Sequence, residues 1–154
     1  MPVDILKEQG EMMAHRLGFV LWPRRWQTYI DMHEWLMHRL MALEHQNIPD
    51  QPGIYTLLVQ PGIANHPAAS YLMYVGRTNS LRRRFSEYLN ERKRETGRPK
   101  IYRLLNMYPD NIWFCFTIAP ENRLSNIEEG LINAYIPPAN DQLPAEIRRV
   151  MGAF

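Results

Sequence analysis

An uncharged run of eight residues, 112–119 (IWFCFTIA), constrains the fold more than any other stretch of this chain. Its aromatic and β-branched side chains favour a β-strand, and apolar residues occupy both sides of that strand. A strand of this kind must be covered on both faces, so we expect it at the centre of a sheet with helices packed against it.

Two further runs rich in strand-forming residues, 53–60 and 70–76, lie on either side of a connection (61–69) rich in glycine, proline, asparagine and alanine. This arrangement predicts an antiparallel pair of strands joined by an extended hairpin loop. Together the three runs predict an α/β protein with a small three-stranded antiparallel sheet flanked by helices.

Helices are expected after the second strand and after the third. They cover about 79–95, 99–108 and 122–135, with one or two further turns after Pro144. We expect Thr78 or Asn79 to cap the first of these helices. Pro99 is expected to begin the second, since proline is favoured in the first helical turn.

The N-terminal part of the chain predicts a helical extension (1–48) in front of a core domain (49–154). A short helix is expected over 4–17 and a longer one over 24–46. In the longer helix, residues recur at helical spacing: Tyr29, His33, Leu36, Leu40 and Leu43. Because this apolar stripe is broad, the helix must pack on the core domain, on a second copy of the chain or on a partner protein.

Composition excludes several classes of protein. With 45% hydrophobic and 22% charged residues among 154, the chain has the balance of a globular protein and not of a disordered or fibrous one. No apolar run is long enough to span a membrane, and the N-terminal residues lack the pattern of a secretory signal. A single cysteine, Cys115, excludes an internal disulfide. We expect a cytoplasmic protein without a membrane partner.

Positive charge is concentrated in one segment of the chain. Residues 77–103 carry a net charge of +7, which leaves −5 for the remainder. The segment is either a solvated helix laced with Glu–Arg pairs or a surface for a phosphate backbone. The predominance of arginine favours the second, because the guanidinium group matches the geometry of phosphate.

Six positions spread over the core carry side chains suited to phosphodiester chemistry. The tripeptides GIY (53–55) and YVG (74–76) are followed by Arg84, ten residues after Tyr74, by Tyr88, by Glu128 and, twelve residues later, by Asn140. In this order and spacing, residues 52–140 resemble the GIY-YIG nuclease family. That resemblance implies the family's compact α/β nuclease core.

The resemblance also implies a metal-dependent endonuclease that hydrolyses DNA phosphodiester bonds by a one-metal mechanism. One of the two tyrosines, Tyr55 or Tyr74, orients or deprotonates the attacking water, and the sequence leaves open which of them does so. A phenol has a pKa of about 10, so this role needs positive charge nearby. Arg77, three residues after Tyr74, is expected to supply it.

The remaining matched positions are assigned by the same resemblance to the phosphate and the metal. Arg84 would grip the scissile phosphate, with Tyr88 one helical turn along on the same face. Glu128 would hold a single Mg²⁺ or Mn²⁺, a hard cation that carboxylate, phosphate and water bind. Asn140 would brace the pocket through hydrogen bonds.

The partner is expected to be DNA, with RNA left open. Residues 82–84 are adjacent arginines that a helix points in different directions, so only one can face the pocket, and the spacing from Tyr74 selects Arg84. Contacts with the nucleic-acid backbone are expected from Arg77, Arg82, Arg83, Arg92, Lys93 and Arg94. Two other functions stay open: a nucleic-acid-binding module of this fold with little catalysis, and a subunit of a larger complex.

Overall fold

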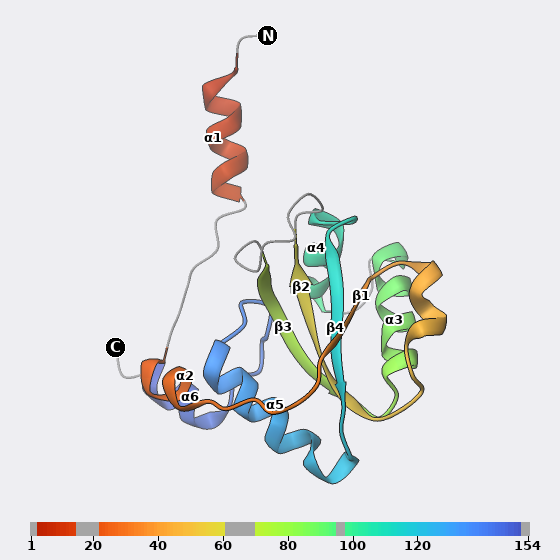
Figure 1. The fold of residues 1–154 in the computed structure, drawn as a ribbon. Coiled ribbons are helices and arrows are strands. Elements are labelled where there is room, and N and C mark those ends of the chain that lie inside the picture. Colours follow the sequence, from red (N-terminus) through yellow and green to blue (C-terminus); the bar gives the residue numbers. More distant parts are fainter. Residues whose placement is uncertain (1–2, 15–21, 61–69, 95–97, 152–154) are drawn as a thin grey trace.

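The computed structural model describes residues 3–14, 22–60, 70–94 and 98–151. The elements in chain order are α1 (Ile5–Ala14), α2 (Pro23–Thr28), β1 (Leu36–Arg39), the 3₁₀ helix η1 (Ala42–Asn47), β2 (Gly53–Val59), β3 (Tyr71–Thr78), α3 (Leu81–Arg94), α4 (Pro99–Met107), β4 (Ile112–Ile118), α5 (Glu121–Tyr135) and α6 (Ala145–Met151). The strands form one antiparallel sheet in the order β1-β4-β2-β3, flanked by helices (Figure 1). No helix among the described residues is long and apolar enough to cross a membrane.

The mixed α/β class predicted from the sequence is confirmed, but the expected number of strands is wrong. The sheet has four strands and not three, because residues 36–39 form β1 and pair with β4. The central position expected for residues 112–119 is confirmed, since β4 lies between β1 and β2. The boundary predicted at residue 48 therefore falls after the first strand of the sheet.

The long helix predicted over 24–46 is wrong. This segment holds the short helix α2, the strand β1 and the start of η1. Two residues of the supposed apolar stripe behave differently, because Leu40 is 1% exposed whereas Leu43 is 82% exposed. Pairing with β4 gives the backbone of β1 its hydrogen-bond partners, and this tertiary contact overrides the helical spacing. A homodimer or partner contact through a continuous helix here loses its structural basis.

Each face of the sheet is covered by its own helices. Because side chains alternate along a strand, Tyr55 and Leu57 of β2 point to one face and Ile54 points to the other. The first face packs against α3, against α4 and against Leu40 and Ile48, which lie on either side of η1 (Figure 1). The second face packs against α5 and α6. Side chains of α3 therefore reach one side of β3, and side chains of α5 reach the other.

The two glycines that belong to the GIY and YVG tripeptides lie where no side chain fits. A Cβ at Gly76 would overlap the ring and hydroxyl of Tyr55 and would lie 2.9 Å from Cε1 of Tyr74. A Cβ at Gly53 would overlap the carbonyl oxygen of Thr117 and approach Leu81 Cδ1 to 2.7 Å. Gly76 pairs directly with Tyr55 across the strands, so its missing side chain is what leaves room for the Tyr55 phenol.

Helix α3 begins with a cap that differs from the expected one. Ser80, and not Thr78 or Asn79, accepts the hydrogen bond from the backbone N–H of Arg83 at 3.2 Å. The Ser80 hydroxyl also donates to Asp50, and Thr78 Oγ1 accepts from the Ser80 N–H at 3.1 Å. These bonds fix the start of α3 directly after β3, and with it the position of every side chain that α3 turns toward the sheet.

Substitution of Gly76 by alanine tests whether this close approach matters for stability. We expect Gly76→Ala to lower the free energy of unfolding by about 1–3 kcal/mol, because the added methyl group must displace the buried Tyr55 ring. Gly10→Ala is the matched control: nothing lies within 4 Å of a Cβ there, and alanine in a helix is favoured over glycine by about 0.5–1 kcal/mol. Equal unfolding free energies of the two variants, measured by denaturant titration, would contradict the packing described.

Candidate active site

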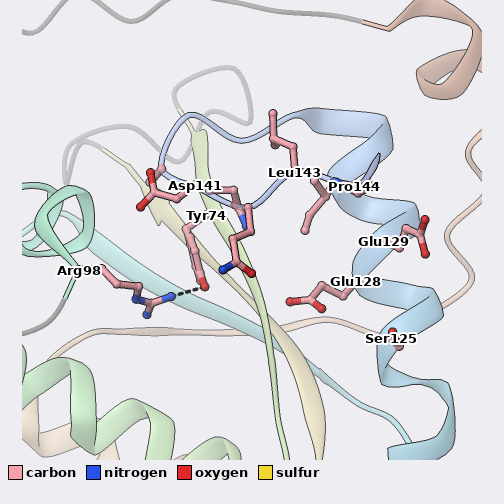
Figure 2. A pocket seen from close by; sticks show the side chains of 12 residues that line it. Tyr74, Arg98, Ser125, Glu128, Glu129, Asp141, Leu143 and Pro144 are labelled. Carbon is pink, nitrogen blue, oxygen red and sulfur yellow. Dashed lines mark hydrogen bonds between the residues drawn. The ribbon is translucent and has the colours of Figure 1, made fainter. Parts of the chain in front are cut away.

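A pocket of about 590 Å³ lies at the free edge of β3. Its lining includes Tyr74 from β3, Arg98 from the start of α4, Glu128 from α5 and Asn140 from the segment after α5, whose side chains could act on a phosphodiester. The carboxylates of Glu129 and Asp141 line it as well. Figure 2 shows Glu128 extending toward Tyr74, whereas the neighbouring Glu129 points away from it. The pocket thus joins groups that approach β3 from both faces of the sheet.

Arg98 is the partner of the Tyr74 hydroxyl (Figure 2). Its Nη1 donates to that oxygen, and the guanidinium carbon lies 4.9 Å from the centre of the Tyr74 ring. The sequence placed Arg98 in the basic segment but gave it no role in the site. Its position directly before Pro99 marks a helix start, yet no spacing rule relates a helix start to a strand 24 residues earlier.

Two buried phenols lie behind Tyr74. The hydroxyls of Tyr55 and Tyr88 are 2.7 Å apart, and Arg98 Nη2 donates to the Tyr88 oxygen at 3.0 Å. Tyr55 is 1% exposed and Tyr88 is 0% exposed. The ring centroids of Tyr55 and Tyr74 are 6.1 Å apart. The three tyrosines and Arg98 thus form one packed and hydrogen-bonded group, which we call the phenol cluster.

Burial keeps the two inner phenols neutral. It raises the pKa of Tyr88 to about 12, with a further increase from Tyr74 and an opposing effect of Arg98. Burial also raises the pKa of Tyr55 well above its usual value, and the neighbouring phenols Tyr88 and Tyr74 add to this effect, whereas Arg84 opposes it. Both hydroxyls therefore stay protonated at ordinary pH. Of the three phenols in the cluster, Tyr74 is the one that lines the pocket.

Glu128 approaches the pocket from the opposite side of β3. Its Oε2 lies 3.1 Å from Nε of Arg77, which points to the α5 face of the sheet because it pairs with Ile54. Burial raises the pKa of the Glu128 carboxyl, and Arg77 partly offsets this. The cation expected beside the phenol, Arg77, therefore contacts the carboxylate instead, and Arg98 donates to Tyr74.

The surroundings of Glu128 suit a divalent cation. A half-buried carboxylate in a pocket bears a desolvation cost that a cation would reduce. A small hard cation such as Mg²⁺ keeps several waters and needs only one or two protein carboxylates. Among the described residues no group of three His, Cys, Asp or Glu gathers around a common point. Glu128, together with water and a ligand's oxygens, fits this mode of binding.

Asn140 fixes one wall of the pocket to the sheet. Its side-chain amide donates to the Val75 carbonyl at 2.8 Å, and its side-chain oxygen accepts from the Val75 N–H at 2.9 Å. The Ala139 N–H donates to Met73 at 2.8 Å, so this segment runs along the outer edge of β3. Helix α5 ends at Tyr135. Its C-cap, Ile136, has a φ of 42°, which is unusual for a β-branched residue and turns the chain back toward β3.

Arg84 does not reach the pocket lining. Its Nη1 lies 2.8 Å from Glu87 on the same helix, its Nε has no partner among the described residues, and its charge acts on Tyr55. Of the six matched positions, the structure brings Tyr74, Glu128 and Asn140 together in the pocket. Tyr55 and Tyr88 form the layer beneath Tyr74.

The predicted nucleic-acid contacts occupy three kinds of position. Arg82 and Arg92 bind backbone carbonyls of the N-terminal part of the chain, those of Ile48 at 2.8 Å and Leu40 at 3.4 Å. Arg83 is exposed, donates to Asn79 and lies 3.6 Å from Glu87, and Lys93 is exposed. The side chain of Arg94 lies outside the described residues. The first two arginines thus hold α3 against η1 and its flanks, whatever else they contact.

Removal of the Tyr88 hydroxyl tests the phenol cluster. We expect Tyr88→Phe to lower the free energy of unfolding by about 1–3 kcal/mol, because it leaves the buried Tyr55 hydroxyl without its partner. Tyr71→Phe is the control, since Tyr71 is 54% exposed. Both variants are compared by denaturant unfolding. A Tyr88→Phe protein as stable as the Tyr71→Phe protein would show that the buried hydroxyls do not depend on one another.

Comparison with known proteins finds similarity in structure only. No protein-family model matches the chain, and the search of curated proteins found no match. The fold is similar to crystal structures of the GIY-YIG N-terminal endonuclease domain of UvrC from Thermotoga maritima. One, bound to its catalytic divalent cation, magnesium, is 22% identical with a TM-score of 0.46 over 64% of this chain and 92% of that domain. A point mutant of the same domain is 21% identical with a TM-score of 0.46 over 65% and 93%.

Proposed function

We propose that this protein is a metal-dependent endonuclease that hydrolyses phosphodiester bonds in DNA. The observation that carries the proposal is the pocket at the edge of β3, into which a phenol hydrogen-bonded to a guanidinium and a half-buried carboxylate converge from opposite faces of the sheet. Hydrolysis of a phosphodiester needs a base for water, a partner for the leaving oxygen and positive charge at the phosphate. The pocket and its borders contain residues for each of these roles.

Tyr74 is the better candidate for the base. A general base must come within hydrogen-bond distance of the attacking water. Tyr55 is buried behind the sheet surface, whereas Tyr74 lines the pocket. In this proposal Tyr74 acts as the phenolate, takes a proton from the attacking water and becomes the neutral phenol, while Tyr55 and Tyr88 hold the Tyr74–Arg98 pair in place from behind.

Glu128 is the candidate ligand for one divalent cation, Mg²⁺ or Mn²⁺. When bound, such an ion supplies Lewis-acid stabilisation to the phosphate and the leaving oxygen. The contribution of the chain is to hold the Glu128 carboxylate at the pocket, and Arg77 orients it through the bond to Oε2. Asn140 keeps the wall opposite α4 in place by its two bonds to Val75.

Arg84 is proposed to leave its ion pair with Glu87 and to bind the phosphate of the DNA instead. Its present partner, Glu87, has a side chain that is 41% exposed, and ion pairs at such positions contribute only about 0–1 kcal/mol. A phosphate group offers a guanidinium a stronger, bidentate contact than an exposed carboxylate does. Exposed basic side chains on α3, Arg83 and Lys93, would then contact the backbone on either side, and Arg77, Arg82, Arg92 and Arg94 stay predicted contacts.

A cleavage panel tests the proposal. Purified protein is incubated with plasmid, linear duplex, single-stranded and branched DNA and with RNA, with and without Mg²⁺ or Mn²⁺. We expect metal-dependent cleavage of at least one DNA substrate. Tyr74→Phe is expected to reduce the rate by about 10²–10⁴-fold, which is the usual contribution of a general base. Binding of DNA without any metal-stimulated cleavage would contradict the proposal and favour a binding module.

Glu128→Gln tests the proposed metal ligand by a second measurement. Mg²⁺ is expected to raise the melting temperature of the wild-type protein and of Glu129→Gln, because binding to the folded state stabilises it. Glu129 is the matched control, because it also borders the pocket next to Glu128 but its side chain points away from Tyr74 (Figure 2). Glu128→Gln should lose the thermal shift and should cleave DNA much more slowly than the wild type and Glu129→Gln. An unchanged shift in Glu128→Gln would place the cation elsewhere.

A further inference from the structure

Arg98 occupies a position that the proposed function does not yet explain. Its guanidinium donates to two phenol oxygens at once, that of Tyr74 through Nη1 and that of Tyr88 through Nη2. It also lies over both rings, 4.9 Å from the centre of the Tyr74 ring and 6.0 Å from that of Tyr88. One side chain therefore joins the phenol that lines the pocket to the phenols buried behind it.

The alternative cation is engaged elsewhere. Arg77 is closer to Tyr74 in sequence, but adjacent strand residues point to opposite faces, and Arg77 pairs with Ile54 on the α5 face. There it binds Glu128, and its side chain is 51% exposed. The positive charge at the Tyr74 hydroxyl is therefore supplied by α4 and not by β3.

We propose that Arg98 is a positioning residue that orients the Tyr74 hydroxyl and stabilises its negatively charged form during catalysis. This role rests on the proposed endonuclease function. A guanidinium can only donate hydrogen bonds, so the hydroxyl proton of Tyr74 cannot point toward Arg98. The proton must point elsewhere, and the pocket that Tyr74 lines is the open direction. A cation that donates to a phenol oxygen favours the phenolate, the form that can accept a proton from water.

The backbone around Arg98 holds it in this place. Arg98 is the N-cap of α4 with extended backbone angles, and Pro99 restricts the first helical position. The helix is anchored by Ile101 and Leu105, both 0% exposed. The Lys100 ammonium lies 2.7 Å from Asp141, but both side chains are about half exposed, so this pair adds little to the anchoring of α4.

The charged groups around Arg98 keep it protonated. Burial alone would lower its pKa, but the hydroxyls of Tyr88 and Tyr74 outweigh burial, and the net pKa is raised. Burial raises the pKa of the Glu91 carboxyl on α3, and the nearby charges of Arg98 and Arg84 oppose this increase. Among the described residues, Glu128 and Glu129 of α5 and the Lys100–Asp141 pair also lie at the pocket. A change with pH in the working range would therefore not come from loss of the Arg98 charge.

Three variants separate this role from a structural one. Arg98→Gln removes the charge, Arg98→Lys keeps it without the forked donors, and Arg123→Gln removes an exposed arginine of α5 outside the basic segment. We expect Arg98→Gln to lower kcat on the DNA substrate by about 10²-fold and to move the rising limb of the pH–rate profile to higher pH by about 1–3 pH units. Arg98→Lys should recover part of both effects, and Arg123→Gln should match the wild type. A pH profile unchanged in Arg98→Gln, with cleavage intact in the wild type, overturns the role of Arg98 and leaves the endonuclease proposal standing.

A measurement without substrate keeps the two proposals apart. The ultraviolet absorbance of tyrosinate is followed during a pH titration in the wild type, Tyr74→Phe, Arg98→Gln and the double variant. The absorbance step that belongs to Tyr74 is the difference between the wild type and Tyr74→Phe, and in the absence of Arg98 it is the difference between Arg98→Gln and the double variant. The first difference should come at lower pH than the second. Far-ultraviolet circular dichroism verifies folding over the same range, and Arg98→Lys replaces Arg98→Gln if the latter does not fold. Coincident steps would refute the stabilisation of the Tyr74 anion, whether or not the protein cleaves DNA.

Discussion

The register of β2 against β3 is the constraint on which the rest of the site depends. It places Tyr55 directly opposite Gly76, and only a residue without a side chain leaves space for the phenol there. The Tyr55 hydroxyl then reaches Tyr88 on α3, and Tyr88 in turn shares Arg98 with Tyr74. A shift of the β2 register by one residue would turn Tyr55 to the α5 face, and the phenol cluster could not form.

The position of β3 at the edge of the sheet explains how groups from opposite faces meet in one pocket. In the interior of a sheet, side chains of α3 and α5 would be separated by the neighbouring strands. At the edge the only separation is β3 itself, and the chain after α5 closes the outer side by binding Val75 and Met73. The free edge of the strand is thus covered and cannot pair with another sheet at these residues.

The sequence predicted the parts of the fold that local patterns determine. The uncharged run of β4, the helix start at Pro99 and the strands around both tripeptides follow from composition and spacing, and they agree with the structure. The segment 24–46 could not be predicted, since its apolar spacing imitates a helix and only pairing with β4 makes Leu36–Arg39 a strand. Local propensity gives no information on such a long-range contact.

The candidate site shows the same division. The resemblance to the GIY-YIG family selected Tyr74, Glu128 and Asn140, and these three residues line one pocket. It could not show that Tyr55 is buried, that Arg77 turns to Glu128 or that Arg98 reaches Tyr74, because these facts depend on which face each strand residue takes and on how α4 packs. The sequence thus identified the side chains, while packing decides which of them reach the pocket.

Tyr74 and Glu128 are proposed to act on one phosphate from opposite faces of β3, and a double-mutant cycle tests this most directly. Metal-dependent DNA cleavage is measured for the wild type, Tyr74→Phe, Glu128→Gln and the combined variant. Groups that act as a unit have non-additive effects, so the combined variant should be no slower than the slower single variant. Losses that multiply, as for two independent sites, would contradict the claim.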